Sequence, residues 1–467
     1  MEDIRKIIEG GGHCTVVGLG ASGMSAARLL QARGARVAVS DSRSEAEIDD
    51  SFRRWLGSTG CAAEWGGHNE SFLLQSDCIV VSPGVPLELP ALATARQQGI
   101  PILGEMGLAC QFVGEPIVAV TGTNGKSTVV RLLGDIFARA LRKVFVGGNI
   151  GTPVADYVLA GDKAEVLVLE VSSFQLDSIG LFKPQVAILL NISPDHLDRY
   201  PDNDAYIQSK MRIFSDQESN QIAIVNGDDP TISAWPEKLP GHCLTFSNRV
   251  RQTSAIWLEG NTAVYTGGQA DGQRERYELP PQLLAGPNPA NAMAAILAAR
   301  QMSCPPAAIA EALTDFSPLA HRMTPVAEID GVFFIDDSKA TNIGAVEAAL
   351  QSISRPVILI AGGRDKRGGY GLLANAVHEK VKAMVLIGEA REAMAAAFAS
   401  MCRIELAADM EEAVQTAMRQ AAPGDIVLLS PACASFDMYS SYAHRGRVFQ
   451  EAVRQLKTRL AARTAAG

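Results

Sequence analysis

Short runs of apolar residues alternate along the chain with segments in which apolar residues recur at helical spacing. In the first hundred residues, apolar runs predict strands at 14–17, 36–40, 77–81 and 101–103, with a helix that begins near Ala21. Strands that alternate with helices are typical of an open sheet covered by helices on its faces. The first part of the chain therefore predicts an α/β unit.

The middle of the chain repeats the pattern. Nearly all-apolar runs predict parallel strands, buried on both faces, at 117–120, 144–146, 166–171 and 186–192. The stretch 231–280 looks irregular, apart from a hairpin predicted at 255–265 around Glu259-Gly260-Asn261.

A third series of alternating elements begins near residue 318. Helical patterns such as 344–353 and 410–420 separate apolar runs that predict strands at 332–335, 357–360, 383–387, 403–406 and 426–429. The alanine-rich tail after Arg459 is predicted to fray. The last part of the chain therefore predicts another open α/β sheet.

The length of the chain agrees with three separate cores. A chain of 467 residues is too long for one ordinary core. The predicted domains are 1–104 (Rossmann-like), 105–317 (a P-loop-type mononucleotide-binding parallel sheet) and 318–467 (Rossmann-like). The predicted fold class is therefore α/β with three domains.

Composition narrows the class of protein. A hydrophobic fraction of 47% with 20% charged residues is that of a folded soluble protein. The net charge of −9, without a basic run, argues against a nucleic-acid partner. We find no apolar stretch long enough for a membrane span and no signal-peptide core. The eight cysteines form no CxxC or CxxH pair, which favours a reducing cytoplasm over disulfides or a zinc site.

The segment IVAVTGTNGKSTVVRLL has the pattern of a phosphate-binding loop. A β-branched strand leads through a glycine-rich turn to Lys126, Ser127 and a helix. Backbone N–H groups at such a helix start face an anion, Lys126 adds a mobile charge, and Ser127 offers a hydroxyl to a phosphate-bound Mg²⁺. Val120 stands where the usual GxxxxGK[ST] spacing has its first glycine, so a plain glycine turn is the alternative.

A second glycine-rich turn, GxGxxG, lies near the N-terminus. Gly18, Gly20 and Gly23 stand between a strand and a helix, and Asp41 ends the next strand, where a dinucleotide-binding fold places its ribose-binding acid. The glycines specify only a tight turn and a close approach to a diphosphate, so NAD, another nucleotide diphosphate and a purely structural turn all remain open. Arg43 adds a cation suited to a base or a phosphate.

Polar residues follow the predicted central strands, where ligands gather in such sheets. They are Lys126-Ser127, Asn149 in GGNIG, Glu170 at the end of VLVLE, and His196 in NISPDHLDRY. A carboxylate and an imidazole facing a nucleotide phosphate suit Mg²⁺, directly or through water. The alternatives are that Glu170 caps the next helix and that His196 is held by Asp195 and Asp198.

Lys210 is the least expected residue of the middle segment. Ile207, Met211 and Phe214 mark one helix face, and Lys210 falls on that same face. A lysine buried there would have a lowered pKa and a reactive neutral amine. The pattern alone favours a lysine that extends its amine to solvent. Asn288 begins a later helix, GPNPANAMAAILAA, either as a cap or with its amide free for a ligand.

These motifs together resemble the Mur ligases, most closely the branch that adds D-glutamate to UDP-N-acetylmuramoyl-L-alanine. In chain order they are GLGASG, SPGV, TGTNGKST, GNIG, LEVSSFQL, DHLDRY, NPANAMAA, HR, DDSKATN and SPACASFD. TGTNGKS would also fit folylpolyglutamate synthetases, whereas DSKATN and SPACASFD point to the D-glutamate branch. A DNPR signature, typical of diaminopimelate-adding relatives, is missing between them. Departures are Pro287, where many relatives have His, and Tyr442, where Phe is common.

The resemblance implies a role for each matching residue. The UDP group is expected near Ser22 and Gly84 (diphosphate) and near Asp41, Ser42 and Arg43 (uracil), with Asn149 and His196 at the muramoyl-alanine end. ATP is expected at Gly122, Thr123, Asn124, Gly125, Lys126, Ser127, Thr128, Asn288, Arg322 and Asp337. D-Glutamate is expected at Lys339, Thr341, Lys366, Ser435 and Tyr442.

The resemblance also implies the catalytic and metal residues. The expected catalytic residues are Lys126, Glu170, His196 and Lys210, and the expected ligands of two Mg²⁺ ions are Ser127, Glu170, His196 and Lys210. Family lysines at the place of Lys210 are carbamylated, which would explain a lysine on a buried face. The implied reaction is attack of the UDP-MurNAc-L-alanine carboxylate on ATP, giving an acyl phosphate that the D-glutamate amine then attacks. A cytoplasmic monomer is expected.

Three other functions remain open from the sequence. The GxGxxG turn with Asp41 suggests an NAD-dependent oxidoreductase, which would leave Lys126 and Lys210 unexplained. A non-catalytic nucleotide-binding regulator predicts ATP binding without turnover. An amino-acid ligase of different specificity is the nearest alternative.

Overall fold

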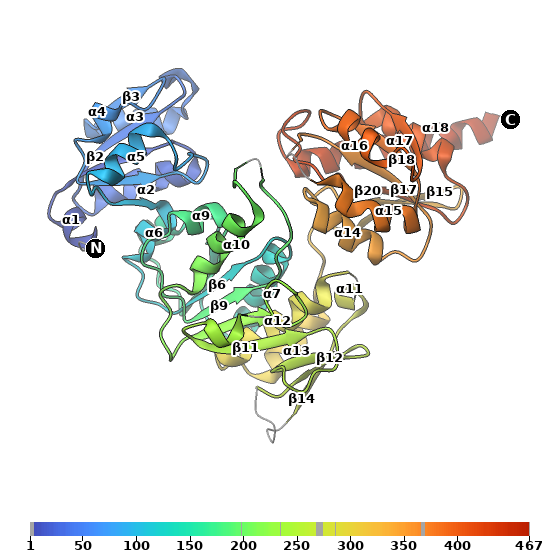
Figure 1. Ribbon diagram of the computed structural model, residues 1–467, viewed down its shortest axis with the longest axis horizontal. Coiled ribbons are helices and arrows are strands. Elements are labelled where there is room, and N and C mark those ends of the chain that lie inside the picture. Colours follow the sequence, from blue (N-terminus) through green and yellow to red (C-terminus); the bar gives the residue numbers. More distant parts are fainter. Residues whose placement is uncertain are drawn as a thin grey trace.

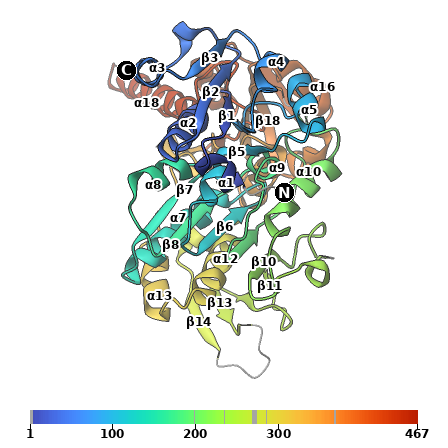
Figure 2. The same cartoon turned by 90° about the vertical axis from the view of Figure 1, so that its left-hand side faces the viewer.

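The computed structural model describes residues 4–197, 199–233, 235–267, 274–284, 286–365 and 369–466. The chain forms three lobes, each built on its own sheet (Figure 1). The N-terminal and C-terminal lobes lie above the central lobe and on opposite sides of it, and Figure 2 shows the same arrangement from the side. The predicted α/β class with three units is confirmed, whereas the boundaries at residues 104 and 317 stay a prediction.

The N-terminal lobe has five parallel strands in the order β3-β2-β1-β4-β5. Helix α2 packs on one face, and α4 and α5 cover the other through Leu73 and Leu92. The elements are α1 (Ile4–Glu9), β1 (His13–Val17), α2 (Ala21–Ala32), β2 (Arg36–Asp41), α3 (Asp50–Thr59), β3 (Ala62–Trp65), α4 (Glu70–Leu73), β4 (Cys78–Val81), α5 (Pro90–Gln97), β5 (Ile102–Gly104) and α6 (Glu105–Cys110).

The central lobe has a nine-stranded sheet in the order β14-β13-β12-β11-β10-β9-β6-β8-β7. The seven neighbouring strands β12-β11-β10-β9-β6-β8-β7 pair in parallel, whereas β13 pairs antiparallel with both β12 and β14. The elements are β6 (Ile117–Thr121), α7 (Lys126–Arg139), β7 (Val144–Gly148), α8 (Val154–Ala160), β8 (Val166–Glu170), α9 (Ser173–Asp177), β9 (Val186–Leu189), α10 (Asn203–Met211), β10 (Ile222–Asn226), β11 (His242–Ser247), β12 (Ile256–Glu259), β13 (Thr262–Tyr265), β14 (Glu275–Glu278), α11 (Pro281–Leu284), α12 (Asn288–Gln301) and α13 (Pro306–Thr314).

The C-terminal lobe has six strands in the order β15-β16-β20-β17-β18-β19, of which only β15 is antiparallel. Helices α14, α15 and α16 cover one face, and α17 and α18 the other. The elements are β15 (Thr324–Ile329), β16 (Val332–Asp336), α14 (Ile343–Gln351), β17 (Val357–Gly362), α15 (Ala374–Lys380), β18 (Val381–Ile387), α16 (Arg391–Phe398), β19 (Arg403–Leu406), α17 (Met410–Gln420), β20 (Ile426–Leu429) and α18 (Tyr442–Ala466).

Two expectations about regular structure are wrong. The stretch 231–280 is less irregular than expected, because β11 and β14 lie within it beside the confirmed hairpin β12–β13. In β11, Leu244 and Phe246 alternate inward in a short, otherwise polar run, so the apolar signal is weak. The tail after Arg459 is not frayed, because α18 stays helical to Ala466.

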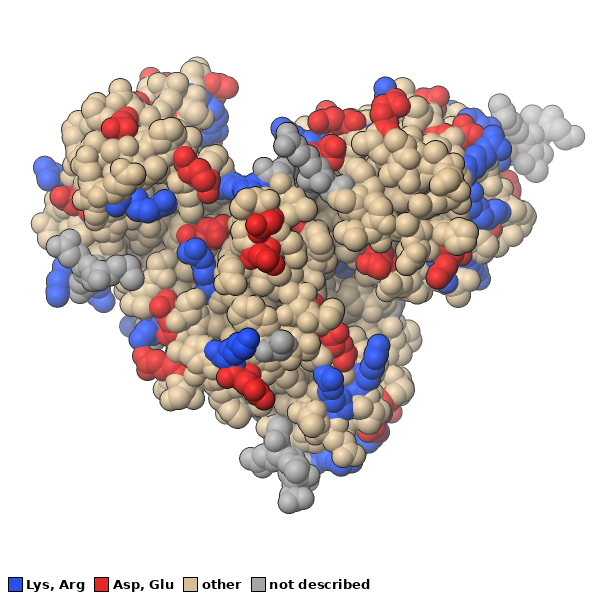
Figure 3. Space-filling view, viewed as in Figure 1, with Lys and Arg blue, Asp and Glu red and all other residues tan. Residues whose placement is uncertain are grey.

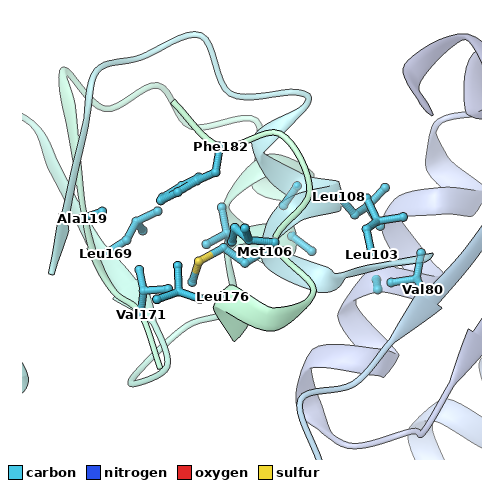
Figure 4. Close-up of a cluster of buried hydrophobic side chains, with 14 of the residues drawn as sticks. Val80, Leu103, Met106, Leu108, Ala119, Leu169, Val171, Leu176 and Phe182 are labelled. Carbon is cyan, nitrogen blue, oxygen red and sulfur yellow. The ribbon is translucent and has the colours of Figure 1, made fainter. Parts of the chain in front are cut away.

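One apolar core joins the N-terminal lobe to the central lobe. Leu103, Met106 and Leu108 pack in the same cluster as Leu176 and Phe182 (Figure 4). The C-terminal lobe keeps its own clusters, and the face shown in Figure 3 is hollowed between the two upper lobes. Lysine and arginine mix there with acidic residues, without a basic patch. Among the described residues, none of the helices is long and apolar enough to cross a membrane.

Candidate active site

The phosphate loop joins β6 to α7 and depends on two glycines. Gly122 and Gly125 have φ values of +144° and +91°, which favour glycine. A Cβ on Gly125 would lie 2.2 Å from Asn291 Oδ1. The N-cap of α7 is Gly125, which has no side chain to cap the helix, so the positive end of the helix dipole lies at this loop. Lys126 Nζ folds back to donate to the Gly122 and Thr123 carbonyls at 2.7 and 2.9 Å.

Glu170 lies at the end of β8, next to β6. Its side chain is buried, and Asn149 Nδ2 donates to Oε1 at 2.9 Å. Within the described part of the chain, the buried Oε2 has no hydrogen-bond partner. The alternative that Glu170 caps the next helix is wrong, because Ser172 caps α9 in a capping box with Gln175. The structure therefore leaves one carboxylate oxygen available beside the phosphate loop.

Lys210 lies on α10 and is only 2% exposed. Nζ donates to the Gly122 carbonyl at 3.0 Å and lies 4.6 Å from the centre of the Tyr206 ring. Burial, and then the positive charge of Lys126, hold the pKa of Lys210 well below its ordinary value. The expectation of a solvent-extended amine is wrong, since an inward carbonyl and an aromatic ring receive the amine.

His196 lies in the loop after β9 with a φ of +57°. Its backbone N–H donates to Asp195 Oδ1 at 2.9 Å, and the centre of its ring lies 4.7 Å from the centre of the Phe174 ring. The alternative that neighbouring acids hold His196 is thus supported for Asp195, whereas Asp198 lies outside the described residues. Within the described ranges, no group of three or more His, Cys, Asp or Glu side chains could hold a metal ion. The metal ligands Ser127, Glu170, His196 and Lys210 stay a prediction.

The C-terminal lobe contributes Lys339 to the same place. Its Nζ donates to Ser127 Oγ at 3.1 Å and lies 5.4 Å from the centre of the Tyr442 ring. Burial, with Arg322 as the next cause, lowers the pKa of Lys339 to about 8. A cavity of about 550 Å³ opens beside these three residues.

Three further residues were expected near D-glutamate. Ser435 is buried, and Thr341 is half-buried on the same loop as Lys339. Lys366 lies outside the described residues. Their contact with an amino acid therefore stays a prediction.

A second cavity, of about 480 Å³, lies between the phosphate loop and the C-terminal lobe. Its lining contains the expected nucleotide residues Asn124, Thr128, Asn288, Arg322 and Asp337. Burial raises the pKa of Asp337 to about 7, against the opposing effect of Arg322.

Asn288 faces this cavity rather than capping its helix. Pro287 holds the cap position of α12 without a side-chain hydrogen bond, so the capping alternative is wrong. Among the described residues, Asn288 Oδ1 and Asn291 Nδ2 are buried without partners. The cavity therefore offers unused polar atoms to a ligand.

The residues expected near UDP lie at the ends of the N-terminal strands: Asp41 is the last residue of β2, Ser42 and Arg43 follow it, Gly84 follows β4, and Ser22 lies in the first turn of α2. Asp41 accepts from the Leu19 N–H at 2.6 Å and from the Arg43 guanidinium at 2.9 Å. Burial alone would raise the pKa of Asp41, but the bonds from Arg43 and Leu19 outweigh it and lower the pKa to about 2. The Asp41 carboxylate already accepts hydrogen bonds from Arg43 and Leu19, which weakens the hypothesis that it binds the ribose of NAD. Contacts of these five residues with UDP stay predictions.

Sequence reasoning missed two arginines. Arg199 crosses from the His196 loop to the N-terminal lobe, where it donates to the Val85 carbonyl at 2.8 Å, and it lies 4.3 Å from the centre of the Phe174 ring. Arg445 of α18 is completely buried and donates to the carbonyls of Cys433 and Ser338 at 3.0 and 2.9 Å. Arg199 stands within the DHLDRY motif, which is a usable signal, whereas Arg445 stands outside the motifs.

Comparison with known proteins agrees with this geometry. The chain matches the Mur ligase MurD-like N-terminal domain over residues 12–104, the Mur ligase middle domain over 120–299 and the Mur ligase glutamate ligase domain over 321–433. It is 46% identical to the UDP-N-acetylmuramoylalanine–D-glutamate ligase of Desulfosudis oleivorans, over 95% of this chain and 96% of that protein. The chain belongs to the Mur ligase family.

Further Mur ligases support the assignment. The UDP-N-acetylmuramoylalanine–D-glutamate ligase of Syntrophotalea carbinolica is 42% identical over 96% of this chain and 98% of that protein. Among solved structures, a pseudomurein peptide ligase type C from Methanothermus fervidus matches with a TM-score of 0.62 and 19% identity, over 96% of this chain and 100% of that one. MurF ligase from Thermotoga maritima in complex with ADP matches at 0.57 and 17%, over 95% of each chain. These structural matches concern the fold alone.

Proposed function

We propose that this Mur ligase is an ATP-dependent enzyme that joins D-glutamate to UDP-N-acetylmuramoyl-L-alanine through an acyl phosphate, in the synthesis of peptidoglycan precursors. The observation that carries the proposal is the convergence of Lys126, Lys210 and Lys339 on the loop Gly122–Ser127. Relatives that are 40–46% identical over nearly the whole chain bear the name of this activity.

ATP fits the phosphate loop and the cavity of about 480 Å³. The positive start of α7 and the Lys126 side chain would receive its phosphates, and Asn288, Arg322 and Asp337 line the place for its nucleoside. The related MurF ligase was solved in complex with ADP, which supports nucleotide use by this fold.

The side chains near the phosphate loop fit Mg²⁺. The unpartnered oxygen of Glu170 and the Ser127 hydroxyl are oxygen donors of the kind that Mg²⁺ prefers. We propose these two as direct or water-mediated ligands, with His196 and Lys210 completing the sites of two ions. Bound Mg²⁺ would neutralise phosphate charge during the transfer.

Lys210 fits a carbamate. Burial lowers the pKa of Lys210 and so increases the fraction of neutral amine, and a neutral amine can react with carbon dioxide. The product would be an anion beside Lys126, which supports a role of carbamylated Lys210 toward a second Mg²⁺.

The residues of the chain act in two chemical steps. In the first, the carboxylate of UDP-MurNAc-L-alanine attacks the γ-phosphate of ATP, and ADP leaves. Two anions approach each other here, and Lys126 with the start of α7 stabilises the combined charge. In the second, the amine of D-glutamate attacks the acyl carbon, phosphate leaves, and an amide remains.

Binding residues hold the two other substrates. We propose that Ser22, Asp41, Ser42, Arg43 and Gly84 hold the UDP group and that His196 and Asn149 orient the muramoyl-alanine end. Lys339, Thr341, Lys366, Ser435 and Tyr442 are proposed to hold D-glutamate. Arg199 supports the first set, because it donates to the carbonyls of Gly84 and Val85.

Three further properties belong to the proposal. The domains are 1–104, 105–317 and 318–467, and they bind the UDP substrate, ATP and the amino acid. The enzyme acts in the cytoplasm, which the eight free cysteines support. It acts as a monomer, which size-exclusion chromatography with light scattering would test.

The test is phosphate release from Mg-ATP with UDP-MurNAc-L-alanine, comparing D-glutamate with L-glutamate, L-lysine, diaminopimelate and no amino acid. Release only with D-glutamate is the expected result. Release with another amino acid would keep the ligase but overturn the specificity. Nucleotide binding by folded protein without release would favour a regulator instead.

A further inference from the structure

The side chain of Asn342 connects the C-terminal lobe to two loops of the central lobe. Asn342 immediately precedes α14, and it is 6% exposed. Its Nδ2 donates to Asn124 Oδ1 in the phosphate loop and to Asp195 Oδ2 beside His196, both at 3.1 Å. Asn124 Nδ2 donates back to Asn342 Oδ1 at 3.2 Å. The two asparagines thus form a reciprocal amide pair between lobes.

Asn342 uses its whole hydrogen-bonding capacity. Besides Asn124, its Oδ1 accepts from the Ala345 N–H at 2.9 Å and so caps α14. The backbone N–H fixes which end of the amide is the oxygen, because only oxygen can accept from it. An asparagine amide offers two donors and two acceptor sites, and all four are occupied here. Serine, aspartate and alanine cannot reproduce this set.

A glycine two residues later is a second sign of a built contact. A Cβ on Gly344 would lie 2.5 Å from Ser193 Oγ, in the loop that leads to Asp195. The pocket at this contact, beside Asp195, His196 and Asn342, has a volume of only about 20 Å³, room for a single water. The start of α14 therefore sits directly against the central lobe.

Asn124 is itself held in place. Its N–H donates to Asn191 Oδ1 at 2.9 Å, and Asn191 Nδ2 donates to its carbonyl at 3.0 Å. The loop that ends at Asn342 also carries Lys339, which reaches Ser127. The C-terminal lobe thus touches the phosphate-binding segment at two points, and the Asn342 contact includes the His196 loop as well.

We propose that Asn342 is a positioning residue, which seats the C-terminal lobe on the phosphate loop and the His196 loop and thereby holds Lys339 over Ser127. The inference rests on the proposed function, because Lys339 belongs to the proposed D-glutamate site. No substrate contact is proposed for Asn342 itself. It acts through Asn124, Asp195 and Lys339.

The first test compares Asn342→Ser with the wild-type enzyme. Serine retains the helix cap but removes both donors. The expected kcat falls about 10- to 100-fold, because a bond to a carboxylate and an amide pair are lost together. The KM for UDP-MurNAc-L-alanine should change less than kcat, because the UDP group is proposed to lie on the N-terminal lobe and only the muramoyl-alanine end lies near His196. Asn69→Ser is the matched control, because Asn69 caps α4 in the N-terminal lobe.

Asn342→Asp separates positioning from capping. Aspartate caps a helix as well as asparagine does, but it places a carboxylate against Asp195. A pure capping role predicts wild-type kinetics for Asn342→Asp, whereas the proposal predicts a lower kcat than that of Asn342→Ser. Gly344→Ala is a second route to the same loss, because it clashes with Ser193. Gly371→Ala, whose Cβ would meet nothing within 4 Å, is its control.

Hydrogen exchange of residues 122–128 in nucleotide-free protein gives a readout that does not depend on the reaction. We expect faster exchange there in Asn342→Ser and Gly344→Ala than in the wild type and the two controls. Unchanged exchange and kinetics in both variants would overturn the inference. Wild-type protein that forms no amide would overturn the proposed function, and the exchange data would still decide the role of Asn342. If Asn342→Ser fails to fold, Gly344→Ala decides.

Discussion

Lys210 and Lys126 donate to the same carbonyl oxygen, that of Gly122, at 3.0 and 2.7 Å. Two ammonium groups on one acceptor repel each other, and burial adds to the cost of charging Lys210. Of the two lysines, the buried Lys210 is therefore the one whose pKa we expect to fall and whose amine loses its proton more readily. Its amine lies against the Gly122 carbonyl of the phosphate loop, so an anion formed on it would lie near the positive charge of Lys126.

Replacing Lys210 tests this arrangement. Lys210→Ala is expected to lower kcat by about 100-fold or more, because it removes the proposed carbamate anion near the reacting phosphate. Short carboxylic acids such as formate should restore part of the activity by supplying the missing carboxylate. Lys183→Ala is the control, since exposed Lys183 pairs with Glu218 at the surface. Loss of activity without any rescue would speak against a carbamate on Lys210.

Arg199 gives a prediction about the first substrate. Its planar guanidinium lies over the Phe174 ring and donates to the carbonyls of Gly84 and Val85. The compact ammonium group of lysine cannot make all three contacts. Arg199→Lys should raise the KM for UDP-MurNAc-L-alanine about tenfold and leave the KM for ATP unchanged. Arg212 is an exposed arginine that lines a surface pocket together with Arg199, and Arg212→Lys should change neither KM. Steady-state kinetics with each substrate varied in turn measures this, and a rise in both KM values would contradict it.

The sequence predicted best where local pattern and buried strands agree. The all-apolar runs of β6, β8 and β9 and the glycine turn before Lys126 leave few alternatives, since β-branched residues and glycine limit the backbone directly. Polar residues at strand ends then meet at one edge of the sheet, so Glu170 and Lys126 were expected together. The short strand β11 was missed because tertiary pairing, rather than local apolar content, creates it.

Contacts between distant segments lie beyond a pattern along the chain. Lys210 lies on the apolar face of its helix, and its amine is buried there because the Gly122 carbonyl and the Tyr206 ring receive it. The pattern along the chain contains neither of these contacts. The contacts of Asn342 with the central lobe are equally hidden from a local pattern, because Asn124 and Asp195 lie 218 and 147 residues away in the sequence. Arg445 joins the loops of Ser338 and Cys433 by donating to their backbone carbonyls. Every residue type has such a carbonyl, so the sequence gives no indication of these bonds.

Gly125 gives a prediction about nucleotide binding. A Cβ there would collide with Asn291, and its φ of +91° is strained for an L-residue. Gly125→Ala should therefore weaken ADP binding by about 100-fold. Gly114→Ala, with open space around its Cβ, should bind ADP normally. Isothermal titration calorimetry measures both, and equal affinities would show that the loop tolerates a side chain.

Glu105 gives a prediction about stability and pH away from the reacting atoms. Its carboxylate is buried at the junction of the first two lobes, where Oε1 accepts from the Ala155 N–H at 2.6 Å. Burial raises the pKa of Glu105 from 4.5 to about 7, while the Ala155 bond opposes this shift. Between these two values the folded state binds more protons than the unfolded state, so this group makes stability fall as pH rises. The contribution is complete below pH 4.5 and is lost above about pH 7.

Glu105→Gln keeps an acceptor for Ala155 and removes the charge. At pH 8 the variant should exceed the wild type in free energy of unfolding by up to about 3 kcal/mol, which corresponds to the shift of the Glu105 pKa. At pH 5 the advantage should shrink, because the wild-type carboxyl is then protonated. Glu70→Gln, at the exposed start of α4, is the control for the substitution itself. Urea unfolding at both pH values measures the difference, and an equal effect at pH 5 and pH 8 would mean that the carboxyl of Glu105 does not titrate in this range.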